Sequence, residues 1–369
     1  MRGEPTPVWD SGNTTVWEEY LDVVLVAANC LVLLITSVVG VAANTFVILA
    51  VCHQKSLQTS VNALVVNLAV VDFLRCVIDC PVLLNIITTV HERGRVHSLV
   101  CDTQMASFSF SCCVQLSTLA CISVERYQAI AKPFETKQRK KRVRTLIPLT
   151  WTLAILLAAF CQIFLRDSPV YVRCQGWPRG TSLSYDTNGL YVLLPLWAAC
   201  FSLITGFYMR IFALVRSHNR KIFDKGISAP NKDLAEDKQN RGSTVVENCH
   251  DPNNDAIKLE GAVCVMPSKA NKERVRKRKE STMAKRAGYI IITFLLFWLP
   301  LLTSILGNFV VHKNRTPQKL IFQDLDILSV SVTCVTSLSD PIIYAAVNPQ
   351  FRSEFYKLKS WVKSRFTKT

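Results

Sequence analysis

Three ionisable residues interrupt a long apolar segment, in the stretch VDFLRCVIDCP: Asp72, Arg75 and Asp79. At about 100° per residue of helix, Asp79 projects about 20° from Asp72, and Arg75 projects about 60° from it, so all three lie on one face. An isolated charge at the centre of a bilayer costs several kcal/mol or more, and such residues normally face a bundle interior with partners. The stretch therefore predicts a buried polar site inside a membrane bundle.

Two roles are open for Arg75 and Asp79. Their i,i+4 spacing allows them to pair and neutralise each other as a structural feature. Alternatively, Arg75 anchors an anionic group of a ligand, or Asp79 anchors a cationic one. Substitution of either residue would separate these roles, because a ligand site alters the response without loss of surface expression.

The elements that must position these residues are membrane helices. Half of the chain is hydrophobic and its mean hydropathy is positive, which is high for a soluble protein. A bilayer core is crossed by about 20 apolar residues in a helix. Apolar segments of this length predict helices at about 22–52, 60–89, 99–129, 145–165, 187–216, 286–311 and 320–345.

The net charge of +16 is concentrated in a few segments. Basic runs occupy 132–144 (KPFETKQRKKRVR), 271–280 (NKERVRKRKE) and the tail after Gln350. Positive charge near helix ends marks the cytoplasmic side, so the N-terminus is expected outside the cell and the C-terminus inside. These runs favour contact with the membrane surface or with a partner protein, and nucleic-acid binding is not expected because they lie at helix ends.

Residues on the predicted outer side support this topology. Asn13 and Asn314 begin glycosylation sequons, and both fall outside. Of the 14 cysteines, only Cys101 and Cys174 lie on the outer side, where oxidation is favoured. We expect these two cysteines to form a disulfide between the third helix and the loop before the fifth.

The chain divides into three parts: an extracellular tail (1–21), a seven-helix domain (22–348) and a C-terminal part (349–369). The first twenty residues hold no apolar run, so no cleavable signal peptide is expected. The polar inner loop, at about 217–280, is expected to be mostly disordered. In the C-terminal part, an amphipathic helix is predicted by apolar residues at helical spacing: Phe351, Phe355, Leu358 and Val362. The expected fold is therefore an all-α membrane bundle of seven helices with a short eighth helix.

Short motifs occur in order along these helices. The third helix ends in Glu125-Arg126-Tyr127, and the sixth contains FLLFWLP. The others are Asn44 in GVAANTFV, NLAVVD at 67–72, Trp151, the 25-residue separation of Cys101 from Arg126, and DPIIY at 340–344. Together they resemble the motifs of rhodopsin-like (class A) G-protein-coupled receptors, and the resemblance covers about residues 22–360.

The resemblance implies a receptor that passes an extracellular stimulus, or basal activity, to heterotrimeric G proteins through outward movement of the sixth helix. It implies an inner switch, in which Arg126 pairs with Glu280. The full set is Glu125, Arg126, Tyr127, Glu280, Tyr208 and Tyr344. It also implies a core set below the ligand pocket: Trp298, Pro300, Phe294 and Leu116. Arrestin, a receptor kinase and membrane lipid are further expected partners at the plasma membrane.

The resemblance also implies an interior polar site, formed by Asn44, Asp72, Gln115, Ser337 and Asp340. In the family, the acid at the position of Asp72 often binds sodium. Here Gln115 replaces the usual Ser and Asp340 adds a second acid. Sodium binding and a proton shared by the two acids are equally open; no other metal and no cofactor are expected.

The extracellular ligand is not identified by the sequence. Phe108 stands where receptors for amines carry Asp, and no Lys occurs from Ile321 to Asn348, with Cys334 at the opsin position. A standard amine and retinal are therefore not expected. The candidate pocket residues are Arg75, Asp79, Phe108, Cys112 and Asp326.

Two other function classes stay open. One is a receptor-shaped scaffold or heteromer partner without G-protein exchange, which the altered Gln115, Cys200 and Asp340 positions allow. The other is an ion or proton transporter, against which the absence of internal repeats argues. No enzyme is expected, because the sequence has no zinc-ligand cluster, nucleophile elbow or phosphate loop.

Overall fold

The structure is a computed structural model that describes residues 10–132, 135–175, 185–227, 269–314, 320–347, 351–357 and 360. It divides into two compact units. The first contains residues 1–211 and 284–369, and the second contains residues 212–283, which include the adjoining ends of two long helices. Within the described residues all regular structure is helical.

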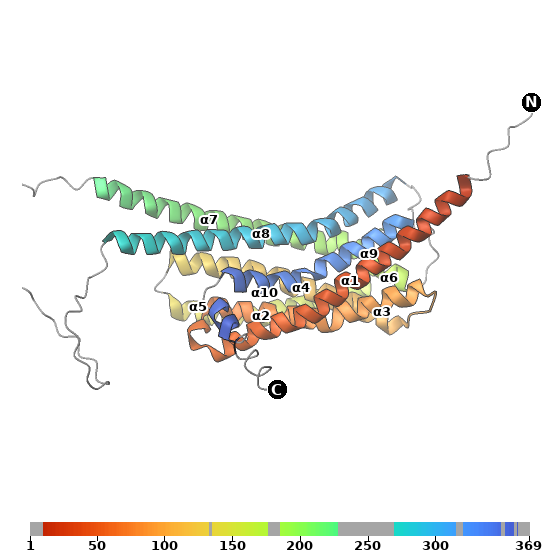
Figure 1. Ribbon diagram of the computed structural model, residues 1–369, viewed down its shortest axis with the longest axis horizontal. Helices are drawn as coiled ribbons and strands as arrows, with labels where there is room; N and C mark the ends of the chain where they lie inside the picture. The colour runs from red at the N-terminus through yellow and green to blue at the C-terminus, as the bar shows by residue number, and fades with distance from the viewer. Residues whose placement is uncertain are drawn as a thin grey trace, which may run out of the picture. The chain divides into compact units, whose positions relative to one another are not determined.

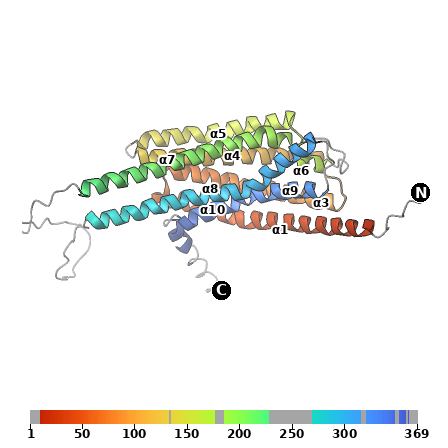
Figure 2. The ribbon, with the colours of Figure 1, turned by 90° about the horizontal axis from the view of Figure 1, so that it is seen from above.

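The helices of the first unit run alongside one another in both ribbon views (Figure 1 and Figure 2). In chain order they begin with α1 (Asp10–His53), the 3₁₀ helix η1 (Lys55–Leu57), α2 (Ser60–Leu74), the π-helix η2 (Arg75–Asp79) and α3 (Cys80–His91). Next come α4 (Ser98–Ala131), α5 (Thr136–Phe164), α6 (Pro169–Cys174) and the π-helix η3 (Gly189–Leu193). The last are α7 (Leu194–Ile227), α8 (Lys269–Lys313), α9 (Leu320–Cys334) and α10 (Thr336–Val347).

The described residues include 7 helical segments that are long and apolar enough to cross a membrane. They confirm the predicted seven-helix architecture. Several helices extend beyond the predicted ends: α1 begins at Asp10, α5 begins at Thr136, and α7 continues to Ile227. The flanking residues are polar, so hydropathy does not mark them, but Lys, Arg, Gln and Glu have good helix propensity.

The inner loop expected at about 217–280 is accordingly shorter, because α8 begins at Lys269. Its remaining residues, 228–268, lie outside the described part of the chain. The side chains of Asn13, Glu280 and Tyr344 also lie outside the description, although the backbone of each is helical. Roles predicted for them stay predictions.

The second membrane segment contains a π-turn at the stretch that carries Arg75 and Asp79. The backbone N–H of Cys80 donates to the carbonyl of Arg75, five residues earlier. Pro81 follows directly; it has no N–H to donate, and its ring clashes with a carbonyl four residues earlier in a regular helix. A π-turn accommodates one extra residue and is common at functional sites.

The π-turn packs closely against α1. Gly40 lies where a Cβ atom would come within 2.4 Å of Cys76 Sγ, so the absence of a side chain permits the contact. Ser37 Oγ donates to the carbonyl of Cys76 over 2.8 Å. Helix α1 also packs against α2, α3, α9 and α10. The first and second membrane segments are thus held together at the level of the buried charges.

Helix α4 occupies the interior of the first unit. It packs against α2, α3, α5, α6 and η2, and its buried face runs along most of its length. The predicted disulfide is present, joining Cys101 in α4 to Cys174 in α6 with a Cα–Cα distance of 5.7 Å. The segment after α5 is therefore anchored to the N-terminal end of α4.

The seventh membrane segment is divided at Val335, between α9 and α10. The amide of Val335 donates to Val332 over 3.1 Å, a tighter turn than an α-helix. The following residues, Thr336 and Ser337, face the polar interior and are buried.

The short eighth helix is described over residues 351–357. Phe351 is buried and the ring of Phe355 meets that of Phe46 at 5.7 Å. Leu358 and Val362, predicted to continue its apolar face, lie outside the described residues.

Candidate functional site

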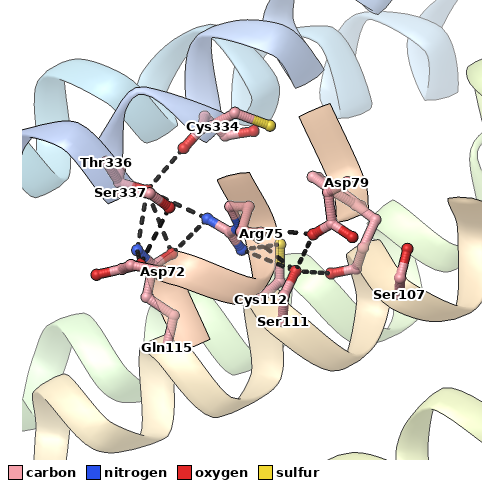
Figure 3. A network of polar contacts seen from close by, with 12 residues as sticks. Asp72, Arg75, Asp79, Ser107, Ser111, Cys112, Gln115, Cys334, Thr336 and Ser337 are labelled. Carbon is pink, nitrogen blue, oxygen red and sulfur yellow. Dashed lines mark hydrogen bonds and ion pairs between the residues drawn. The ribbon is translucent and has the colours of Figure 1, made fainter. Parts of the chain in front are cut away.

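Arg75 lies at the centre of a buried polar network between α2, α4 and the turn from α9 to α10 (Figure 3). Its exposed fraction is 1%, against 0% for Asp72 and 3% for Asp79. Helical side chains tilt toward the N-terminus of their helix. Arg75 therefore reaches back toward Asp72, and Asp79 reaches toward Arg75. The shared face predicted from the spacing is confirmed by the burial of all three.

The guanidinium of Arg75 uses all three of its nitrogens. Nε donates to Ser111 Oγ over 3.3 Å, and Nη2 donates to Ser111 Oγ and Cys112 Sγ, each over 3.2 Å. Nη1 donates to Gln115 Oε1 over 2.7 Å and to Thr336 Oγ1 over 3.2 Å. These contacts join the second, third and seventh membrane segments through one side chain.

Asp79 is the nearest charged partner of Arg75. Arg75 Nε lies 3.7 Å from Asp79 Oδ2, and Ser111 Oγ donates to the same oxygen over 2.6 Å. The pair predicted from the i,i+4 spacing is therefore present. A buried charge needs both a counter-charge and hydrogen bonds to offset its desolvation, and here it has both.

Asp72 lies on the opposite side of Gln115 from Arg75 in this chain of hydrogen bonds. Its Oδ1 accepts from Gln115 Nε2 and from Ser337 Oγ, each over 3.0 Å. Asp340, on α10, is the second buried acid of this predicted site. Asn44 closes the site by donating to the carbonyl of Ser337 over 2.8 Å. The structure thus brings the predicted interior polar residues together.

Two of the remaining pocket candidates lie beside this network. Cys112 contacts Arg75 directly, and the carbonyl of Phe108 accepts from Ser111 Oγ over 3.1 Å. Asp326 lies on α9 and accepts from Ser304 Oγ over 2.6 Å and from Asn308 Nδ2 over 2.9 Å. That these residues line a ligand pocket stays a prediction.

A further buried acid, Asp186, was not singled out from the sequence. It precedes η3, and its Oδ1 accepts from the amide of Gly189 over 2.7 Å. Burial raises the pKa of the Asp186 carboxyl to about 7; the Gly189 amide opposes this rise, and the charges of Asp326 and Asp167 add to it. Its position in a loop, without an apolar pattern, gave no sequence signal.

An ion cluster at the disulfide-bearing end of the bundle was also missed. Arg173, beside the disulfide, pairs with Asp324 of α9, and its Nη2 lies 3.7 Å from Asp22 Oδ1 of α1. His91 Nδ1 lies 3.4 Å from Asp22 Oδ2. These residues are far apart in the sequence, and the adjacency of Arg173 to Cys174 was the one available signal. The cluster joins α1, α3, α6 and α9 at one end of the bundle.

Comparison with known families identifies this architecture. The model of the 7 transmembrane receptor (rhodopsin family) matches residues 43–344. The chain belongs to the rhodopsin family of seven-transmembrane receptors. It is accordingly a multi-pass membrane protein and a G-protein-coupled receptor rather than an enzyme, and the scaffold and transporter alternatives are not favoured.

Individual relatives agree with this assignment. The chain is 26% identical to Opsin-3 of Manduca sexta over 90% of this chain and 76% of that protein. It is 24% identical to 5-hydroxytryptamine receptor 1E of Cavia porcellus, over 89% of this chain and 91% of that one. Among solved structures, squid rhodopsin matches with a TM-score of 0.64 at 20% identity, covering 92% of this chain and 87% of that one, and shows the same fold.

Near the C-terminal end of α4, the acidic residue of the Glu125-Arg126-Tyr127 motif has an unexpected partner. Glu125 is fully buried, and its Oε1 accepts from Arg142 Nη1 of α5 over 3.2 Å. Arg126 is half-buried, and its Nε has no hydrogen-bond partner within the described residues. The ring of Tyr127 lies 5.5 Å from that of Phe207 on α7. Arg142 was part of a basic run and was not distinguished from its neighbours by sequence.

The core residues of this rhodopsin-family receptor lie along α8. Trp298 and Phe294 are buried, with ring centroids 5.9 Å apart, and Leu116 of α4 is buried as well. Phe294 stacks on Trp197 of α7 at 5.8 Å. Pro300 lies within α8, one turn beyond Phe297. The aromatic stack therefore joins α7 and α8.

Proposed function

We propose that this receptor carries an extracellular signal across the plasma membrane by moving α8 away from α4 on the inner side. A heterotrimeric G protein would then enter the opened cavity and exchange nucleotide. The observation that supports this proposal is the ion pairing of Glu125 with Arg142 rather than with its neighbour Arg126. Glu125 is held by Arg142, so the guanidinium of Arg126 is left for other contacts.

In the resting receptor, Arg126 would pair with Glu280, at the base of the sixth membrane segment. In the active receptor, it would contact the G protein instead. Tyr127, Tyr208 and Tyr344 are the other residues proposed to change contacts at this end. An opened inner cavity is a two-state element of the kind that a receptor switch requires.

The proposed topology places the N-terminus outside the cell. The supporting observations are the basic inner segments and the sequons at Asn13 and Asn314. The disulfide and the cluster around Arg173 would then lie at the extracellular end. Arrestin, a receptor kinase and membrane lipid are proposed as partners of the inner surface.

The proposed ligand is neither a standard amine nor retinal, although the relatives include a 5-hydroxytryptamine receptor and an opsin. Phe108 offers no charge to an ammonium group, and Cys334 is buried with its thiol directed at the carbonyl of Val330 over 3.6 Å. A Schiff base needs an amine, which Cys334 lacks. Adding 5-hydroxytryptamine or retinal should leave signalling unchanged, and a saturable response to either would contradict the proposal.

The first test measures ligand-free activation of each main class of G protein at matched surface expression. Arg126→Ala should abolish basal signalling in the class that couples, because it removes the proposed contact. Arg95→Ala, which removes an exposed arginine from the predicted outer side, is the matched control and should signal as the wild type does. Basal signalling that survives Arg126→Ala would contradict the proposed switch.

A further inference from the structure

The interior polar site departs from the cation site common in its family. A hard cation requires several oxygen ligands at once. Gln115 Oε1 and Thr336 Oγ1 would be two of them, but both accept from Arg75 Nη1, over 2.7 Å and 3.2 Å. Asp72 Oδ1 already accepts two hydrogen bonds. Three of the oxygens that a sodium ion would need are therefore already engaged in hydrogen bonds.

Charge leads to the same conclusion. Arg75 and Asp72 are joined through one amide, because Gln115 accepts from Arg75 with Oε1 and donates to Asp72 with Nε2. A second cation beside Asp72 would face the guanidinium at short range in an interior of low dielectric constant, where repulsion between like charges is strong. In this site, the buried oxygens that lack a hydrogen-bond partner within the described residues are Asn44 Oδ1, Asp72 Oδ2 and Asp340 Oδ2, and the charge of the guanidinium opposes a sodium ion beside them.

We propose that Arg75 is a covalently attached cation that replaces sodium in this site, so that Na⁺ does not stabilise the receptor. Its guanidinium links α2, α4 and α10 as a bound ion would, but it cannot dissociate. The stabilisation that Arg75 provides by linking these helices is thus independent of the Na⁺ concentration around the cell. This inference concerns stability and does not depend on which G protein couples.

The test is the unfolding temperature of the purified full-length receptor in equal concentrations of NaCl or KCl. The wild type should unfold at the same temperature in both. Arg75→Ala frees Gln115 Oε1, Thr336 Oγ1 and space for an ion, so it should gain a saturable, Na⁺-selective rise. The rise should be about 2–4 °C when Na⁺ is several times its dissociation constant.

Matched variants make the result specific. Arg75→Lys keeps a tethered cation and should remain insensitive to Na⁺, whereas Arg75→Gln removes the charge with less loss of volume and serves if Arg75→Ala does not fold. Adding Asp72→Asn to the sensitive variant should abolish the rise.

Two outcomes would overturn the proposal. One is a Na⁺-selective rise in the wild type that Asp72→Asn removes, which would show that sodium binds beside Arg75. The other is a folded Arg75→Ala or Arg75→Gln variant with no Na⁺ response, which would show that Arg75 is not what excludes the ion. Both readouts use unfolding alone, so a failure here is distinguishable from a failure of the proposed G-protein switch.

Discussion

At the scale of single residues, Arg75 and Asp79 decide the character of the site. Their common face and their pairing followed from spacing alone. The partners of Arg75 on α4 and α10 could not be predicted, because they come from segments distant in the sequence. With its donors taken by Ser111, Cys112, Gln115 and Thr336, Arg75 holds the helices together, and a role in binding an anionic ligand stays an untested alternative.

Removing Asp79 should therefore destabilise the receptor. Asp79→Ala leaves Arg75 buried without its nearest counter-charge, a change that typically costs about 3–5 kcal/mol. Arg75→Ala should lower surface expression to a similar degree, and the double variant should lose less than the sum of the two. Thermal unfolding and surface expression measure the coupling; an altered response at normal expression would instead favour a ligand site.

A second residue-scale prediction concerns pH. The folded state holds the proton of Asp186 up to about pH 7, whereas an unfolded carboxyl releases it near 3.8. Between these values the unfolded state binds fewer protons, so stability falls as pH rises, by at most about 1.4 kcal/mol per pH unit. Above the window this contribution is constant.

Asp186→Asn should remove that part of the pH dependence, because the amide stays neutral and its oxygen still accepts from Gly189. Unfolding temperatures across the window provide the measurement. Glu92→Gln, at an exposed acid that does not contribute to the pKa of Asp186, is the matched control and should retain the wild-type slope. An unchanged slope in Asp186→Asn would show that another group titrates.

At the scale of elements, hydropathy located all of the membrane helices but not their ends. The basic run that opens α5 and the polar residues that close α7 are helical without being apolar. The π-turn at Arg75–Asp79 was not predicted either, since Pro81 is compatible with several helix distortions. Contacts with other helices favour the π-turn over the alternatives. Gly40 of α1 leaves room for the side chain of Cys76, and Arg75 donates hydrogen bonds to residues of α4 and α10.

Gly40→Ala tests that contact between α1 and the π-turn. The added methyl group would meet Cys76 Sγ at 2.4 Å, and overpacking of this kind typically costs about 1–3 kcal/mol. Cys76→Ala removes the sulfur, so the Gly40→Ala/Cys76→Ala variant should be more stable than the two separate effects predict. Additive losses of unfolding temperature would mean that the sulfur moves aside freely.

At the scale of the whole molecule, two sets of interactions hold the helices of the first unit together, one in the interior and one at the end of the bundle that carries the disulfide. The polar network joins three membrane segments in the interior. The disulfide and the cluster around Arg173 join α6 to α1, α3, α4 and α9. The disulfide was predictable because so few cysteines lie on the outer side, whereas the ion cluster depends on how the helix ends meet.

Loss of the disulfide should destabilise the assembled bundle. Cys101 and Cys174 are separated by 73 residues, and a cross-link closing a long loop is typically worth about 2–5 kcal/mol. Cys101→Ser, Cys174→Ser and the double variant should unfold at equally lowered temperatures, because each removes the same bond. A double variant clearly worse than either single one would indicate independent roles for the two thiols.

The three charges of the second membrane segment also constrain how the chain is made. A charged residue near the middle of a helix opposes its transfer into the bilayer by about 2.5–3.5 kcal/mol, and residues 72–79 lie near the middle of the span Ser60–His91. Neighbouring apolar residues offset part of that cost, and Asp79 neutralises Arg75, but Gln115 and Thr336 are translated later. During synthesis we therefore expect the second membrane segment to stay beside the insertion machinery until α4 and α10 have been made. Only then do Gln115 and Thr336 supply the hydrogen-bond partners of Arg75.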